Sequence, residues 1–166
     1  MSAFQAISAR SRDVQRPPWS NEASIRAECT SCGDCLRACP EAILIPGPAR
    51  TPSVDFSRGE CTFCGACAEA CHEGVFAPTD MQPWDLVAQI GPSCLLASHV
   101  SCRLCTDFCE TDALRFDLRA GGVGALRVEA EACTGCGACV STCPVAALTL
   151  TSDPNPARQT AKEPVA

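Results

Sequence analysis

The stretch CTSCGDCLRAC, residues 29–39, places four cysteines in the spacing C-x2-C-x2-C-x3-C. The same spacing recurs in CTFCGACAEAC at residues 61–71 and in CTGCGACVSTC at residues 133–143. A recurring pattern of this kind indicates repeated structural units, because each copy specifies the same local fold. We name these segments run one, run two and run four.

A third copy, run three, is irregular. Cys102, Cys105 and Cys109 keep the register, but His99 stands where the first cysteine is expected. Cys94 lies eight residues before Cys102 and is the only other cysteine of the chain, which has sixteen in total. Run three therefore comprises residues 94–109.

This spacing is typical of [4Fe–4S] ligands. Three cysteines at two-residue intervals wrap one side of a cubane cluster, and the fourth ligates the neighbouring cluster. Sequential pairing of the runs predicts four clusters, with every cysteine a cofactor-binding and metal-binding residue. The predicted ligand sets are Cys29, Cys32, Cys35 and Cys71; Cys61, Cys64, Cys67 and Cys39; Cys94, Cys102, Cys105 and Cys143; and Cys133, Cys136, Cys139 and Cys109.

Several alternatives remain open at this level. A nested pairing, run one with run four and run two with run three, is possible, although the linker lengths favour the sequential one. Structural zinc is another alternative, but zinc sites prefer C-x2-C pairs separated by longer loops and not three cysteines in succession. In run three, Cys94 is favoured as the fourth ligand because iron–sulfur sites prefer thiolate. A three-iron cluster, or His99 as ligand, is the alternative.

The segments between the runs predict short elements. Turn residues 46–48 and 121–122, each flanked by apolar stretches, indicate a two-stranded hairpin after run one and after run three. Between runs two and three, Asp80 as N-cap, Pro83 in the first turn and Gly91 at the end predict a short helix over 81–91.

The fold class expected is a small, metal-stapled α+β fold built from two tandem bacterial-ferredoxin-like modules. With only eight aromatic residues, such modules need metal to fold. The expected segments are a basic N-terminal arm (1–21), a two-cluster module (22–78), a linker helix (79–91), a second two-cluster module (92–151) and a disordered tail (152–166).

The sequence also indicates a compartment. Residues 1–28 contain no apolar signal stretch, and no apolar run reaches the roughly 18 residues of a membrane span. We therefore expect a cytoplasmic protein without a membrane span, with reduced thiols available to metal, and this argues against disulfides.

Charge is uneven along the chain. The net charge is −6 overall, +2 over residues 1–26 and −8 over residues 27–150. Clusters with their thiolates add further negative charge. Nucleic acid is therefore not an expected partner, whereas a protein is.

Two tryptophans have different expected roles. Arg10, Arg12 and Arg16 precede the segment Pro17-Pro18-Trp19, and we expect this arm to bind a partner. Trp84 is expected to pack between the modules rather than to anchor a partner.

Four features beyond the runs carry a family resemblance: RPPWS at 16–20, PWDL at 83–86, the wide gap from Cys94 to Cys102, and CTGCGAC at 133–139. Over most of residues 16–150 the chain resembles the NapF family, the ferredoxin-type accessory proteins of the periplasmic nitrate reductase system. The resemblance implies a cytoplasmic protein that binds the catalytic subunit, NapA, before export. It also implies a part in maturation, by supplying electrons or by assisting the iron–sulfur cluster of that subunit.

The sequence also bears on alternative functions. The sequence shows no nucleophile–base pair, phosphate loop or nicotinamide fingerprint, so we predict an electron-transfer or maturation protein that is not an enzyme. The alternative is a general electron-transfer polyferredoxin, or an electron-transfer subunit of a membrane-bound oxidoreductase. A third hypothesis treats the clusters as purely structural or as oxidant sensors.

Overall fold

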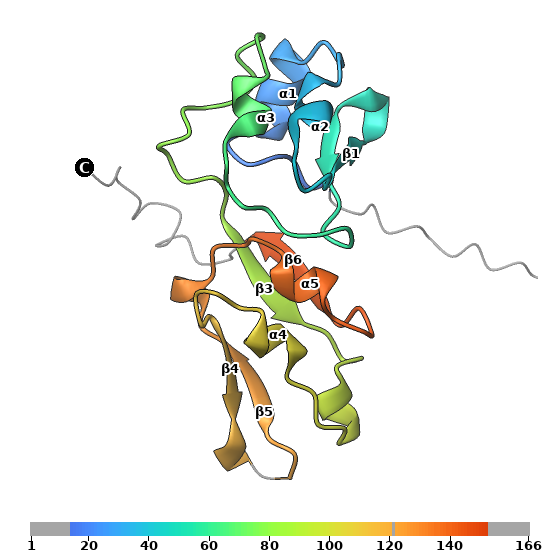
Figure 1. Ribbon diagram of the computed structural model, residues 1–166, viewed down its shortest axis with the longest axis vertical. Helices are drawn as coiled ribbons and strands as arrows, with labels where there is room; N and C mark the ends of the chain where they lie inside the picture. The colour runs from blue at the N-terminus through green and yellow to red at the C-terminus, as the bar shows by residue number, and fades with distance from the viewer. Residues whose placement is uncertain (1–13, 121, 153–166) are drawn as a thin grey trace, which may run out of the picture.

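The computed structural model describes residues 14–120 and 122–152, whose elements form two groups stacked along the long axis (Figure 1). The first group contains the helices α1 (Glu22–Glu28), α2 (Asp34–Ala38) and α3 (Ala66–Glu69) and the strands β1 (Leu44–Pro46) and β2 (Pro52–Val54). The second contains β3 (Leu86–Ile90), α4 (Leu104–Asp107), β4 (Leu114–Asp117), β5 (Ala125–Val128), α5 (Ala138–Ser141) and β6 (Leu148–Ser152). Four 3-10 turns connect them: η1 (Pro48–Arg50), η2 (Leu95–Ser98), η3 (Leu118–Ala120) and η4 (Ala130–Ala132).

Both predicted hairpins are present. β1 pairs antiparallel with β2, with Leu44 opposite Val54, and β4 pairs with β5, with Leu114 opposite Val128. In each pair these residues point into the core, because alternate side chains of a strand share one face. Short helices beside two-stranded sheets make this an α+β fold, the class that the sequence predicts.

The linker helix predicted over 81–91 is wrong. Residues Leu86–Ile90 form β3, which pairs antiparallel with β6, more than fifty residues away along the chain. The local signals have other uses: the Pro83 carbonyl accepts a hydrogen bond from Trp19, and the Gly91 amide donates to Ala147. A remote strand with a matching apolar face overrides weak helix signals, and β-branched residues such as Val87 favour the strand.

Each group has its own small core, in which cysteine is a major component. In the first, Ile43, Leu44 and Phe56 pack with Cys35 and Cys67. In the second, Ala88, Leu114 and Leu148 pack with Cys105 and Cys139.

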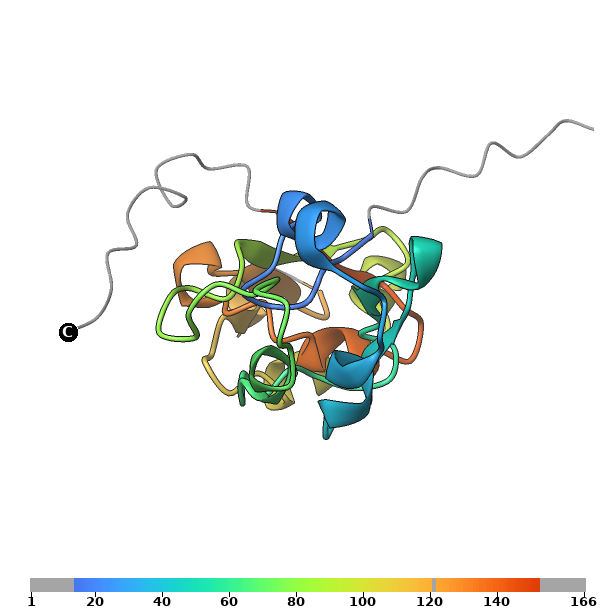
Figure 2. The same ribbon diagram turned by 90° about the horizontal axis from the view of Figure 1, so that it is seen from above.

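Viewed along the long axis, α2 and α3 lie next to each other on one side of the molecule and α1 lies on the other (Figure 2). Cysteine-bearing helices therefore pack in pairs, α2 with α3 and α4 with α5.

The segment Pro17-Pro18-Trp19 is part of the fold, which corrects its predicted role as a partner-binding arm. Trp19 is 7% exposed, and its indole nitrogen donates to the Met81 carbonyl at 2.7 Å. Its main chain forms two more hydrogen bonds, each of 2.7 Å. The Trp19 amide donates to the Pro83 carbonyl, and the Trp19 carbonyl accepts from the Ala77 amide. The apolar triplet therefore packs against its own chain and is not exposed for a partner.

Arg16 is also held in place. Its guanidinium donates to the Thr51 hydroxyl at 2.8 Å and to the Pro52 carbonyl at 2.9 Å, and it forms an ion pair with Glu22 at 2.7 Å. The Arg16 guanidinium, followed by Arg26, lowers the pKa of Glu22 below its usual value. Glu22 opens α1, whose N-terminus carries a capping box made by Asn21 and Ser24.

Two predictions fall wholly or largely outside the described residues. Arg10 and Arg12 of the basic arm lie there, as does the predicted tail at 152–166 except for Ser152, the last residue of β6.

Trp84 contacts both groups. Its ring makes edge-to-face contacts with Phe56 and Phe63, with centroids 5.7 Å apart in each case. Its indole nitrogen donates to the Thr134 carbonyl in run four at 3.1 Å. The prediction that Trp84 packs between the two groups is confirmed.

The burial of Trp19 leads to a stability prediction. Replacing it with alanine (Trp19→Ala) should cost about 3–5 kcal/mol, the usual range for removing a buried aromatic side chain. Anaerobic denaturant unfolding of the cluster-loaded protein, followed by circular dichroism, measures this cost. Phe108→Ala is the matched control, because Phe108 is 54% exposed and should change stability by no more than about 0.5 kcal/mol. Equal effects of the two substitutions would contradict the structural role of Trp19.

Candidate metal centres

The sixteen cysteines line four pockets, four cysteines to each. We name them pockets A, B, C and D, in the order in which their loops of three cysteines occur along the chain. Pocket A has Cys29, Cys32, Cys35 and Cys71; pocket B has Cys39, Cys61, Cys64 and Cys67; pocket C has Cys94, Cys102, Cys105 and Cys143; pocket D has Cys109, Cys133, Cys136 and Cys139. The structure thus brings run one together with run two, and run three with run four. This is the sequential arrangement, and not the nested one.

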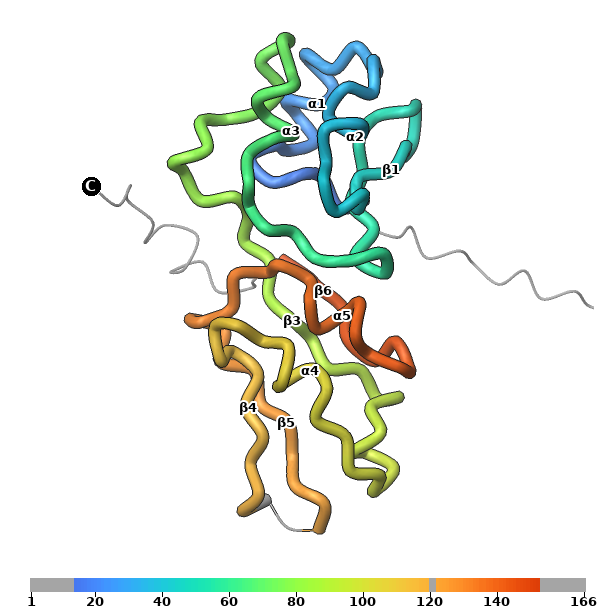
Figure 3. The backbone as a smooth tube through the Cα atoms, in the orientation of Figure 1, coloured from blue at the N-terminus to red at the C-terminus, as the bar shows by residue number. Residues whose placement is uncertain are grey.

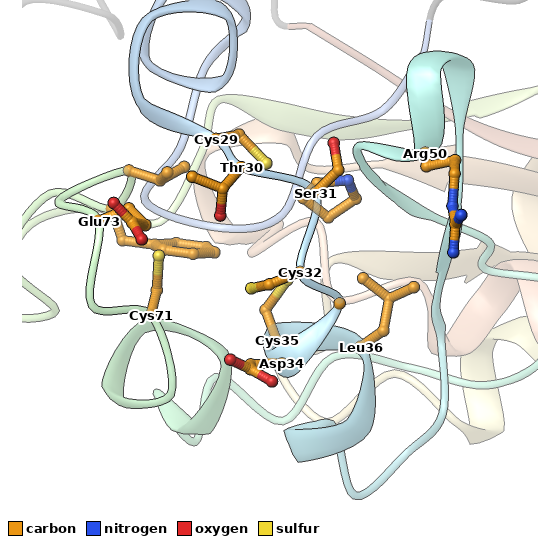
Figure 4. Close-up of a pocket in the computed structure, with 14 residues that line it drawn as sticks. Cys29, Thr30, Ser31, Cys32, Asp34, Cys35, Leu36, Arg50, Cys71 and Glu73 are labelled. Atoms are coloured by element: carbon orange, nitrogen blue, oxygen red, sulfur yellow. The ribbon is translucent and has the colours of Figure 1, made fainter.

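Pocket A shows the common geometry (Figure 4). Cys29 and Cys32 lie on the loop that leads into α2, and Cys71 approaches from the segment after α3. Their sulfur atoms turn into the same space between the two segments. The Arg50 side chain lies at the edge of this pocket, away from the sulfurs.

The short helices explain why each pocket takes a cysteine from its partner run. In run one the third cysteine, Cys35, lies inside α2, and the fourth, Cys39, is the residue at which α2 ends. Four residues of helix advance about 6 Å along the axis, which moves Cys39 away from pocket A. Because α2 packs beside α3, the displaced cysteine reaches the pocket of the other run.

Burial is the main electrostatic influence on the inner thiols. It raises the pKa of Cys35 and of Cys105 to about 11, and those of Cys67 and Cys139 to about 12. Neighbouring cysteines add to the effect, since nearby thiolates repel each other. At neutral pH these thiols keep their protons unless a cation in the pocket takes the place of the protons.

Main-chain amides act in the opposite direction. Amide groups of Leu36, Ala68 and Ala138 hydrogen-bond to the sulfurs of Cys35, Cys67 and Cys136 and lower the pKa values of these thiols. The Ala147 amide donates to the Cys143 sulfur at 3.2 Å. Such N–H donors stabilise negative charge on sulfur and are a normal part of iron–sulfur sites.

The donor set fits a polynuclear iron–sulfur cluster. None of the sixteen cysteines, all of which lie among the described residues, forms a disulfide. Within residues 14–120 and 122–152, no three His, Cys, Asp or Glu side chains close on a single metal ion. Each pocket instead has four thiols among its lining residues and holds about 310–370 Å³ of unfilled space, the open mouth included.

Run three is completed by Cys94. This residue lies at the start of η2 and lines pocket C with Cys102, Cys105 and Cys143. His99 ends η2, is exposed and does not line the pocket. Its backbone is in the left-handed region (φ 59°).

The sequence did not identify the apolar walls of the pockets. Pro18 lines pocket B, and Val75 and Phe76 line pocket A. The only sequence signal for Pro18 is the apolar triplet at 17–19. Its contact with run two is long-range and leaves no local pattern.

In the part of the chain that the structure describes, no helix has the length and apolar character needed to cross a bilayer.

Comparison with known proteins agrees with the four-pocket geometry. Residues 28–75 and 100–147 each match the 4Fe-4S dicluster domain family, so the chain carries two such domains in tandem. Cys94 lies outside the second match.

Two curated relatives cover most of the chain. A ferredoxin-type protein NapF of Haemophilus influenzae is 52% identical over 136 residues, covering 81% of this chain and 77% of its own. The ferredoxin-type protein NapF of Escherichia coli K12 is 44% identical over 135 residues, covering 81% and 82%. With four pockets of cysteine thiols in two dicluster domains and this degree of identity over most of its length, the chain belongs to the NapF family of ferredoxin-type iron–sulfur proteins.

Proposed function

We propose that the chain holds four [4Fe–4S] clusters, one in each of pockets A to D. The observation that carries this proposal is the gathering of four thiols in every pocket. The ligands are those predicted from the sequence: Cys29, Cys32, Cys35, Cys71; Cys39, Cys61, Cys64, Cys67; Cys94, Cys102, Cys105, Cys143; and Cys109, Cys133, Cys136, Cys139. A bound cluster of this kind supplies one-electron redox chemistry.

The protein contributes the environment of each cluster. One central thiol of each pocket is buried, which shields that side of each site from water: Cys35, Cys67, Cys105 and Cys139. Amide donors such as those of Leu36 and Ala68 face the sulfurs and stabilise their negative charge. Burial and N–H donors are two of the means by which a protein sets the reduction potential of a cluster.

We further propose that this protein acts in the cytoplasm as an accessory factor. It binds the catalytic subunit of periplasmic nitrate reductase, NapA, before export and assists its maturation by electron transfer or by supporting its iron–sulfur cluster. Membership of the NapF family supports this role. The net charge of −6 fits a protein partner rather than nucleic acid, and no substrate chemistry of its own is proposed.

One structural observation leaves a second function as a candidate. This is a general electron-transfer polyferredoxin or an electron-transfer subunit of a membrane-bound oxidoreductase. A basic N-terminal arm (1–21) is a feature that an accessory protein needs and a simple carrier does not, and Pro17-Pro18-Trp19 is the apolar segment of that arm. Because Trp19 is buried against the first group, this segment no longer distinguishes the two functions.

The ligand set of pocket C is tested by two substitutions. Cys94→Ser should lower the iron content of the second domain, or convert its four-iron cluster to a three-iron one, because a thiolate ligand is lost. His99→Ala is the matched control and should leave the iron content unchanged, since His99 is exposed and outside the pocket. Iron and acid-labile sulfide analysis with electron paramagnetic resonance gives the result. Full iron in Cys94→Ser with iron loss in His99→Ala would instead establish a Cys3His site.

The accessory function is tested by co-purification. The cluster-loaded chain should retain the unexported form of the catalytic subunit, and an unrelated two-cluster ferredoxin should not. A second variant lacking residues 1–13 tests whether binding needs the arginines at positions 10 and 12. If neither full-length nor shortened protein retains the subunit, the polyferredoxin function is the better account.

A further inference from the structure

Pockets B and D meet directly across the boundary between the two groups of elements. The main-chain amide of Cys61, a residue of pocket B, donates a 2.7 Å hydrogen bond to the carbonyl of Cys136, a residue of pocket D. Figure 3 shows the loop that follows β2 passing beside the segment that leads into α5. Two cysteine loops from different domains are thus joined by their own backbones.

The neighbouring side chains fit this contact closely. Trp84 donates to the Thr134 carbonyl at 3.1 Å and lies edge-on to Phe56 and Phe63. A β-carbon added to Gly135 would lie 2.8 Å from both the Leu86 carbonyl and the Trp84 indole nitrogen. No side chain larger than hydrogen fits there without a shift of the main chain.

Gly137 also leaves no room for a larger side chain. A β-carbon at this position would overlap the ring of Phe56, which is buried in the first core. Gly65 is the equivalent residue of run two and has a similar left-handed backbone (φ 79° against 91°). Its β-carbon would meet only the Thr79 methyl group, at 3.6 Å. Close approach is therefore particular to run four.

The other neighbouring pockets are related through the two cores. Cys35 of pocket A and Cys67 of pocket B share the first core, and Cys105 of pocket C and Cys139 of pocket D share the second. Together with the contact between Cys61 and Cys136, this makes A and B, B and D, and D and C the neighbouring pairs. The order of neighbours differs from the order in the chain.

We propose that Trp84, Phe56, Gly135 and Gly137 form a positioning junction that fixes the distance between pockets B and D. This inference rests on the four-cluster proposal and adds to it which sites of the two domains are nearest neighbours. The junction determines how strongly groups bound in the two domains interact. A and C are then the terminal sites, where a partner would approach without passing the other domain.

The test compares variants of the full chain, purified without oxygen and fully reduced. Gly137→Ala should force the two loops apart and weaken the magnetic interaction between domains, seen as narrower lines and slower spin relaxation in electron paramagnetic resonance. Gly65→Ala is the control: it imposes the same backbone strain in a cysteine loop but pushes against no residue of the other domain. Each variant strains only its own cysteine loop, so a weaker interaction between the domains in Gly137→Ala but not in Gly65→Ala reports on the junction.

A milder variant keeps the test decisive if Gly137→Ala assembles poorly. Trp84→Phe retains an aromatic ring but removes the hydrogen bond to Thr134, and should produce a smaller change of the same sign at unchanged iron content. The junction is refuted if both variants keep full iron and give the spectrum of the unmodified chain, even if their thermal stability falls. Failure of the unmodified chain to bind iron would instead refute the four-cluster proposal and the inference with it.

Discussion

Exchange of the fourth cysteine between paired runs is the constraint on which the rest of the structure depends. Each pocket takes three thiols from one run and one from its partner, so neither site of a domain is complete without the other. This exchange requires α2 to lie beside α3, and α4 beside α5, and the hairpins and small cores follow from that packing. With so few aromatic residues, the chain relies on its cysteines both as core residues and as ligands.

The two domains are tied together by features that the cysteine pattern does not contain. β3 begins two residues after Trp84 and pairs with β6, so this two-stranded sheet starts where the chain leaves the first group. Leu86, the first residue of β3, packs in the first core, while Ala88 packs in the second. Pro17-Pro18-Trp19 closes the first domain from the opposite end of the chain. These contacts make a continuous molecule from two repeats.

The sequence predicted whatever depends on local spacing. The repeated spacing marked the cysteine runs and the turn residues marked both hairpins, because each is a short-range pattern. The pairing of the runs and the choice between Cys94 and His99 stayed open in the sequence, and the structure gathers the cysteines in the sequential sets, with Cys94. The predictions from sequence were wrong where contact with a segment far away along the chain determines the local structure. Leu86–Ile90 became a strand because β6 lies beside it, and Trp19 became a core residue because Met81 and Pro83 accept its hydrogen bonds. Neither partner can be inferred from the segment itself.

The most direct measurement of the central claim is the count of iron and acid-labile sulfide on chain purified without oxygen, together with its resonance spectrum after reduction. The account predicts four four-iron clusters per chain, one for each pocket, with signals broadened by neighbouring clusters. Two clusters per chain, or zinc bound in place of iron and sulfide, would contradict it.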